Sequence, residues 1–372
     1  MTKRSPSSLI GPIAIIIGLL LLGAGGARLL FTPSGPNPAA SPSPAPLAGA
    51  TTAKATNTST PPSPGPDPTP TATASATRVF TIELGASPIS SPNPEPTRAA
   101  EPVVRPASAL DFDGQRAYGF VLDQEALGSR PTGSEAGWAT GDLIIQALDD
   151  ETWAVETQEF FFKGVRGRNV IARAGQGPVI ILGAHYDTRP VADQDPDAQL
   201  RQQPILGAND GASGVAVLLE LANSLDTALL QHEVWLAFFD AEDRGRLDGW
   251  PFSVGARYLA QNLAVRPDAV IVVDMVGDAD QNIFYELNSD PALSQEIWAV
   301  AGALGYSDYI IPAGKYAIID DHTPFLELGI PAIDIIDFDY PYWHTVADTS
   351  DKVSPESLER VGRTLEAWLE SR

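Results

Sequence analysis

Four short apolar runs in this sequence are each followed by side chains that could bind a metal ion. His185, Asp243 and Asp274 end or closely follow the first three runs, and His344 lies beyond the fourth. Imidazole nitrogens and carboxylate oxygens are ligands that zinc takes in three- or four-ligand sites. If the runs are parallel strands of one sheet, these side chains meet at its carboxyl edge, where open α/β sheets bind ligands. The pattern therefore predicts a zinc site at that edge.

Asp210 is a fifth candidate ligand. It lies in the segment Asn209-Asp210-Gly211-Ala212-Ser213-Gly214, directly before the mostly apolar run 215–222, which has helical spacing. An aspartate at a helix start is most often an N-cap. Because Asp210 occurs together with the four candidates above, we interpret it as a metal ligand instead.

A second acidic residue stands directly before Asp243. If Asp243 faces a metal ion, Glu242 can lie beside it as a general base, with its pKa tuned by burial and by the ion. The alternative is a pair of solvated acids on a loop. Of the two remaining histidines, His232 precedes a strand and is assigned no role. His322 lies at a predicted helix start and is interpreted as a structural group.

Predicted helices and strands alternate from about residue 107 onward. We expect helices at 112–127, 137–148, 211–225, 254–263, 291–304 and 355–369, and strands at 153–162, 169–174, 179–184, 234–239, 269–273, 283–287 and 332–336. Ser354 is the expected N-cap of the last helix, with Pro355 at its first position. The alternation predicts an α/β sheet between layers of helices. Several strands are continuously apolar, as central parallel strands are.

The first 32 residues indicate export. Lys3 and Arg4 precede an apolar or small-residue stretch from Leu9 to Ala27, which is long enough to span a membrane. Basic residues on this side keep the N-terminus inside and place the rest of the chain outside. We expect an uncleaved signal anchor, single-pass in the cell membrane. The alternative is a signal peptide cut within Gly23–Ala27, which would release a secreted protein.

Composition separates the remaining chain into two parts. Residues 33–106 are rich in Pro, Ser, Thr, Ala and Gly, which predicts a disordered linker before a globular domain at 107–372. The net charge is −23; residues 1–106 contribute +3, so the domain carries −26. Such an acidic domain is a poor partner for nucleic acid. The absence of cysteine excludes a thiolate nucleophile and a cysteine metal site.

Six motifs resemble those of the zinc aminopeptidase and glutaminyl cyclase superfamily, metallopeptidase family 28. They are Gly183–Thr188, Asn209–Gly214, Phe238–Asp243, Val273–Gly277, Asp320–His322 and Trp343–Thr345. Thr188–Asp197 and Pro204–Gly207 are similar to bacterial glutaminyl-peptide cyclotransferases in particular. The resemblance implies a zinc-exopeptidase-like fold, a three-layer α/β/α sandwich with a mostly parallel mixed central sheet.

The resemblance does not decide whether the site binds one zinc ion or two. In cyclases of this superfamily, the residues that match Asp210, Asp243 and His344 bind one zinc ion. In the aminopeptidases, the matches to His185 and Asp274 bind a second zinc, with Asp210 bridging. This sequence keeps all five residues, so the ligand set does not decide between the activities. Many members have Glu where this chain has Asp243.

Both activities act on the N-termini of peptides or proteins. The cyclase assignment implies that Glu242 is the catalytic base, that Asp274 and Asp320 tune the proton transfer, and that Trp343 forms a wall of the substrate pocket. Trp250 and Tyr340 are further candidates for that wall; for each aromatic residue the alternative is core packing. In the aminopeptidase, Glu242 would deprotonate a water molecule. A non-catalytic binding module is a third reading, but it predicts the loss of Glu242 or of a ligand.

Overall fold

A computed structural model describes residues 104–149 and 152–372. The expected membrane helix and nearly all of the expected linker lie outside these residues. Within the described ranges, no helix has the length and apolar character needed to cross a membrane.

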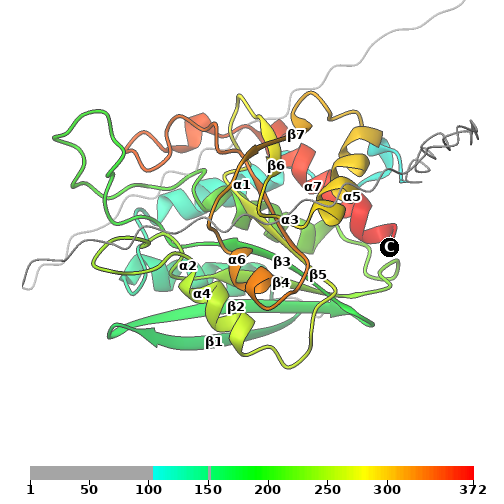
Figure 1. The fold of residues 1–372 in the computed structure, drawn as a ribbon, viewed down its shortest axis with the longest axis horizontal. Helices are drawn as coiled ribbons and strands as arrows, with labels where there is room; N and C mark the ends of the chain where they lie inside the picture. Colours follow the sequence, from blue (N-terminus) through cyan, green and yellow to red (C-terminus); the bar gives the residue numbers. More distant parts are fainter. Residues whose placement is uncertain (1–103, 150–151) are drawn as a thin grey trace, which may run out of the picture. The chain divides into compact units, whose positions relative to one another are not determined.

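A six-stranded mixed sheet forms the centre of the domain (Figure 1). Its strands lie in the order β1-β2-β4-β3-β5-β8, where β4, β3, β5 and β8 are parallel and β1 and β2 add an antiparallel edge. Their bounds are β1 (Ala154–Phe162), β2 (Val165–Gly175), β3 (Val179–His185), β4 (Glu233–Phe239), β5 (Ala269–Asp274) and β8 (Ala332–Ile336). The carboxyl ends of the four parallel strands therefore meet at one edge.

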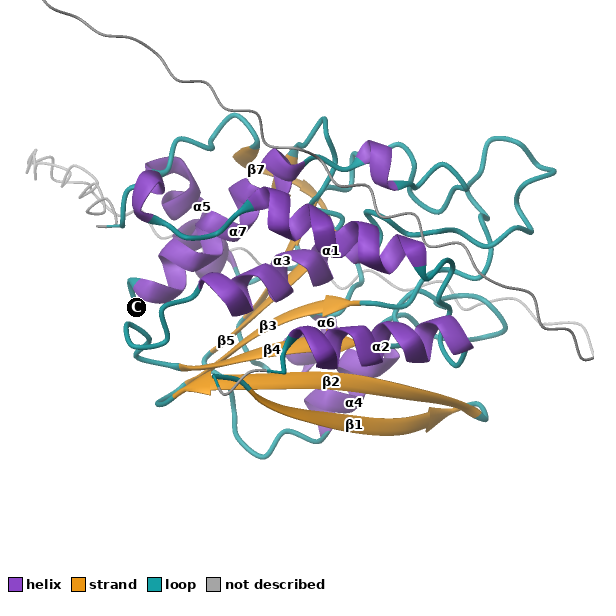
Figure 2. Cartoon of the chain, turned by 180° about the vertical axis from the view of Figure 1, so that it is seen from behind, coloured by secondary structure: helices purple, strands orange, loops and turns teal. Residues whose placement is uncertain are grey.

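Helices cover both faces of this sheet. They are α1 (Gly114–Ala126), α2 (Glu135–Ala147), α3 (Ala212–Ser224), α4 (Val254–Gln261), α5 (Pro291–Ala303), α6 (Thr323–Glu327) and α7 (Pro355–Glu370). Figure 1 shows α4 and α6 in front of the sheet, whereas Figure 2, from behind, shows α1, α2 and α3 in front. The α/β core with a mixed sheet is therefore confirmed.

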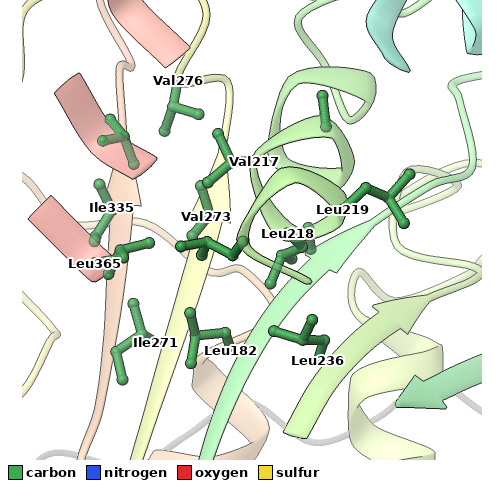
Figure 3. Packing of buried hydrophobic residues seen from close by; sticks show 14 of the residues in the cluster. Leu182, Val217, Leu218, Leu219, Leu236, Ile271, Val273, Val276, Ile335 and Leu365 are labelled. Carbon is green, nitrogen blue, oxygen red and sulfur yellow. The ribbon is translucent and has the colours of Figure 1, made fainter. Parts of the chain in front are cut away.

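Two buried clusters hold the layers together. Leu182 and Leu236 face the α3 side, where they pack with Leu218 (Figure 3). Ile181 and Trp235 belong to the cluster on the α4 side. Because both faces are buried, the central strands read as continuous apolar runs. Each fully buried leucine of this kind contributes about 1.5–3 kcal/mol relative to an exposed one.

Helix α3 packs very closely on the sheet. A Cβ atom added to Gly214 would lie 2.1 Å from the carbonyl oxygen of Val273 in β5, so only glycine permits this approach. Nearly every residue of α3 is buried. This packing brings Asp210, just before α3, to the carboxyl edge of the sheet.

The observed elements follow the predicted ones within a few residues, with one strand missed. Ser354 caps α7 by accepting a hydrogen bond from the N–H of Ser357. Strand β7 (Ile310–Tyr316), which pairs in parallel with β6 (Ile283–Glu286) in a second small sheet, was not expected. Pro312 and Gly314 interrupt its sequence and its middle is exposed, so the strand carries no apolar pattern.

Candidate metal centre and active-site pocket

The five predicted ligands converge in two buried groups at the carboxyl edge of the sheet. One group is Asp210, Asp243 and His344, and the other is His185, Asp210 and Asp274. In each group the candidate ligand atoms lie within 4.8 Å of one another. Asp210 belongs to both groups, which is the arrangement expected of a bridging carboxylate.

The two oxygens of Asp210 face different groups. Oδ1 lies 3.2 Å from Nε2 of His185, which is also 3.2 Å from Oδ1 of Asp274. Oδ2 lies 3.5 Å from Nε2 of His344, which is 3.0 Å from Oδ1 of Asp243. Each group therefore provides one imidazole nitrogen and the carboxylates of two residues, one of which is the shared Asp210.

The donor sets fit zinc. Oδ2 of Asp210 and both carboxylate oxygens of Asp243 are buried without a hydrogen-bond donor, an arrangement that is costly unless a cation satisfies the oxygens. Burial, followed by the charge of Asp210, raises the pKa of Asp243 to about 6. Burial alone would lower the pKa of His344, but the carboxylates around it raise it to about 9. One imidazole nitrogen and carboxylate oxygens from two residues make a set of three protein ligands that zinc accepts.

Asp210 is not the N-cap of α3. The cap residue is Gly211, which makes no side-chain capping bond, and the peptide bond between the two residues is cis. The carboxylate of Asp348 accepts hydrogen bonds from the backbone N–H groups of Asn209 at 2.9 Å and Asp210 at 3.2 Å. The hydroxyl of Tyr340 donates to the same carboxylate at 2.7 Å. Asp348 therefore fixes the backbone that presents Asp210.

Glu242 lies beside the ligands without belonging to either group. The carboxylate of Asp187 accepts hydrogen bonds from the N–H groups of Glu242 and Asp243, at 2.9 and 3.1 Å, and so fixes the turn after β4. Burial, together with the charge of Asp320, raises the pKa of Glu242 well above its ordinary value. A carboxylate with a raised pKa is suited to general base catalysis near neutral pH.

A pocket of about 250 Å³ opens onto the candidate ligands. Glu242, Asp274 and Asp320 line it together with Trp343, whose ring stacks on the imidazole of His344 with 3.9 Å between centroids. The remaining lining residues are mostly apolar and include Phe252, Met275, Ala317, Ile318, Ile319, Ile336 and Phe338, with Arg246 among them. The arrangement combines acidic groups at the ligand end with apolar walls.

Trp250 and Tyr340 do not line this pocket, which corrects the expectation for them. Trp250 packs in a separate cluster, edge-on to Phe162 at 4.8 Å between ring centroids. Tyr340 is buried, with its hydroxyl directed to Asp348. Neither position could be distinguished from Trp343 by residue type, because an aromatic ring serves a core and a pocket wall equally well.

The other two histidines take no part in the ligand groups. His322 is fully buried, with Nε2 at 3.2 Å from Oε2 of Glu286, outside both groups. His232 precedes β4 at the opposite end of the strand from Asp243.

Three residues that contact the candidate ligands or their backbone were not predicted from the sequence as part of the site. They are Asp187, Asp348 and Asp193, of which the last has Oδ1 at 3.3 Å from Nδ1 of His344. Asp187 lies inside the motif Gly183–Thr188 and Asp193 inside the cyclase-like stretch Thr188–Asp197, so the motifs included both positions but did not indicate their contacts.

The family model of peptidase family M28 matches residues 169–369. A solved glutaminyl cyclase from Porphyromonas gingivalis is 34% identical, with a TM-score of 0.66, over 70% of this chain and 99% of that one. A leucine aminopeptidase precursor from Bacteroides thetaiotaomicron is 30% identical, with a TM-score of 0.67, over 73% and 100%. A Zn-dependent exopeptidase from Parabacteroides distasonis is 32% identical, with a TM-score of 0.66, over 70% and 99%.

The fold and the site therefore define a zinc exopeptidase-like enzyme. The chain belongs to peptidase family M28. Both activities expected from the motifs occur among its relatives, and the family assignment made from the sequence is confirmed.

Proposed function

We propose that this protein is a zinc-dependent glutaminyl-peptide cyclotransferase, which converts N-terminal glutamine of peptides or proteins to pyroglutamate and releases ammonia. The observation that carries the proposal is the 34% identity with the Porphyromonas gingivalis glutaminyl cyclase, of which this chain covers 99%. The small pocket supports it, because Glu242 and the group of Asp210, Asp243 and His344 line the same cavity as Trp343.

The chain's own residues account for the proton transfers of cyclisation. Glu242 accepts a proton from the α-amine as its nitrogen bonds to the side-chain amide carbon, and returns a proton to the departing ammonia. Asp320 adds its charge to the burial that raises the pKa of Glu242, which makes Glu242 a stronger base. Zinc held by Asp210, Asp243 and His344 would supply a Lewis acid for the amide carbonyl.

The apolar part of the pocket has a separate task. Trp343, Phe252 and Phe338 line it and would exclude water, which competes with the α-amine as a nucleophile. Ring closure needs no water, so a dry pocket favours cyclisation over hydrolysis.

Aminopeptidase activity is the second candidate, favoured by the group of His185, Asp210 and Asp274. This group could hold the second zinc ion of a two-metal hydrolase. Glu242 would then accept the proton of an attacking water, and the acidic groups of the pocket would bind the α-ammonium of the substrate. The likeness to the leucine aminopeptidase precursor supports this candidate.

Two peptides that differ only in their first residue separate the candidates. The zinc-loaded protein is incubated with a Gln-initiated and a Leu-initiated peptide, and the products are followed by mass spectrometry beside an enzyme-free control. Loss of ammonia from the Gln peptide alone supports the cyclase. Release of free leucine with no loss of ammonia would refute it and establish the aminopeptidase.

We further propose that the enzyme works outside the cytoplasm. The proposal rests on the sequence of residues 1–32, in which Lys3 and Arg4 precede the apolar stretch Leu9–Ala27. Retention of the intact chain in the membrane fraction supports an uncleaved anchor, and a shortened soluble chain outside the cell supports a cleaved signal peptide. An intact chain in the cytoplasm would refute both.

A further inference from the structure

The loop after β3 makes direct contact with the ligands of one candidate zinc group. Arg189 is buried, and its guanidinium donates to both carboxylate oxygens of Asp193 at 2.8 and 2.7 Å. The same guanidinium donates to the carbonyl oxygens of Asp243 at 3.0 Å and Gly245 at 3.1 Å. One arginine thus ties the loop to the turn that carries Asp243.

Asp193 extends this connection to the second ligand. Its Oδ1, which accepts from Arg189, lies 3.3 Å from Nδ1 of His344. A carboxylate at that position favours a proton on Nδ1 and leaves the lone pair of Nε2 directed toward Asp243 and Asp210. Asp193 therefore contacts the imidazole on the side opposite Nε2, the nitrogen that faces Asp243 and Asp210.

The backbone of His344 needs such support. Its φ is 54°, a left-handed conformation that is sparsely populated by residues other than glycine and persists only where its surroundings impose it. The N–H of Gln194 donates to the carbonyl oxygen of His344 at 3.2 Å, and the carboxylate of Asp195 accepts from the N–H of Val346 at 3.1 Å. The loop is thus hydrogen-bonded to the segment around His344 through the backbone of Gln194 and the side chain of Asp195.

The contacts are confined to one of the two groups. In the part of the chain that the structure describes, the hydrogen bonds and ion pairs of Arg189 and Asp193 reach Asp243 and His344 but neither His185 nor Asp274.

We propose that Arg189 and Asp193 are positioning residues that hold Asp243 and His344 in the geometry needed to bind zinc tightly together with Asp210. The proposal rests on the zinc dependence stated above and is independent of which reaction the enzyme performs. Outer partners of this kind change metal affinity by about 10- to 100-fold.

Zinc affinity of an Asp193→Asn variant tests the proposal. The full-length protein is stripped of metal and titrated with Zn²⁺ against a chromogenic chelator, and the thermal midpoint of the metal-free protein is recorded. Asparagine keeps the size of the side chain and removes its charge. We expect one zinc-binding step to weaken by about 10- to 100-fold. The metal-free midpoint reports separately how much folding stability is lost with the ion pair between Asp193 and the buried Arg189.

Two further variants make the result specific. Asp197→Asn is the matched control, because Asp197 lies in the same loop and its carboxylate accepts only a local bond from the N–H of Gln199 in the described hydrogen-bond network. Asp193→Glu restores the charge and is expected to bind zinc more tightly than Asp193→Asn. The proposal is overturned if Asp193→Asn binds zinc as the wild type does, or if Asp197→Asn weakens binding equally. A protein that passes this test without cyclising glutamine would refute the cyclase alone.

Discussion

The substitution Glu242→Gln removes the proposed base while leaving the rest of the site in place. Glutamine has the length and shape of glutamate but does not accept a proton. The backbone N–H at this position stays bonded to Asp187, and the residue is 6% exposed, so the new side chain remains in the pocket. General base catalysis contributes about 100- to 10,000-fold, and we therefore expect kcat to fall by that factor. This corresponds to about 2.7–5.4 kcal/mol of transition-state stabilisation.

The assay combines steady-state cyclisation of a Gln-initiated peptide with the zinc content of the dialysed protein. Zinc should stay bound in Glu242→Gln, because Glu242 is in neither candidate ligand group. The matched control is Glu327→Gln, at a surface carboxylate that pairs with Arg257 outside the site. Wild-type kcat in Glu242→Gln would refute the role of the base, and loss of zinc would show that Glu242 is a ligand instead.

Three further outcomes follow from the structure. His344→Ala should weaken zinc binding by more than about 100-fold, since a lost ligand costs more than a lost outer partner; unchanged zinc content after dialysis contradicts the assignment. Gly214→Ala should destabilise the protein to urea by about 1–3 kcal/mol, because its Cβ would lie 2.1 Å from a carbonyl oxygen of β5, whereas Gly119→Ala, with nothing within 4 Å, should not. Trp343→Ala should raise KM for the Gln peptide, and Trp250→Phe should leave KM unchanged. The reverse result would contradict the assignment of Trp343, rather than Trp250, to the substrate pocket.

The convergence of the candidate ligands could be predicted from the sequence because most of them directly follow strands. His185 and Asp274 are the last residues of β3 and β5, and Asp243 lies four residues beyond β4. Buried parallel strands have continuous apolar sequences, and the positions after them necessarily share one edge of the sheet. Asp210 needed the additional packing of α3 on β5, which the glycines of its segment indicate.

The contacts that Arg189 and Asp193 make with the candidate ligands could not be predicted from the sequence of strands. Arg189 and Asp193 lie in a long loop. No periodicity of apolar residues there indicates which side chains contact one another. The left-handed backbone of His344 could not be predicted from its residue type, because only about a few per cent of non-glycine residues adopt this conformation. Trp250 and Tyr340 were misplaced for a related reason, because an aromatic side chain is equally common in a core and in a pocket.

The fate of water distinguishes ring closure from hydrolysis most directly. The zinc-loaded protein is incubated with a Gln-initiated peptide in water enriched in heavy oxygen, and the intact product mass is measured beside an enzyme-free control. The proposed mechanism predicts a peptide lighter by one ammonia that carries no heavy oxygen, formed faster than in the control. Free glutamine that carries the label, together with a peptide shortened by one residue, would contradict it and establish hydrolysis at the N-terminus.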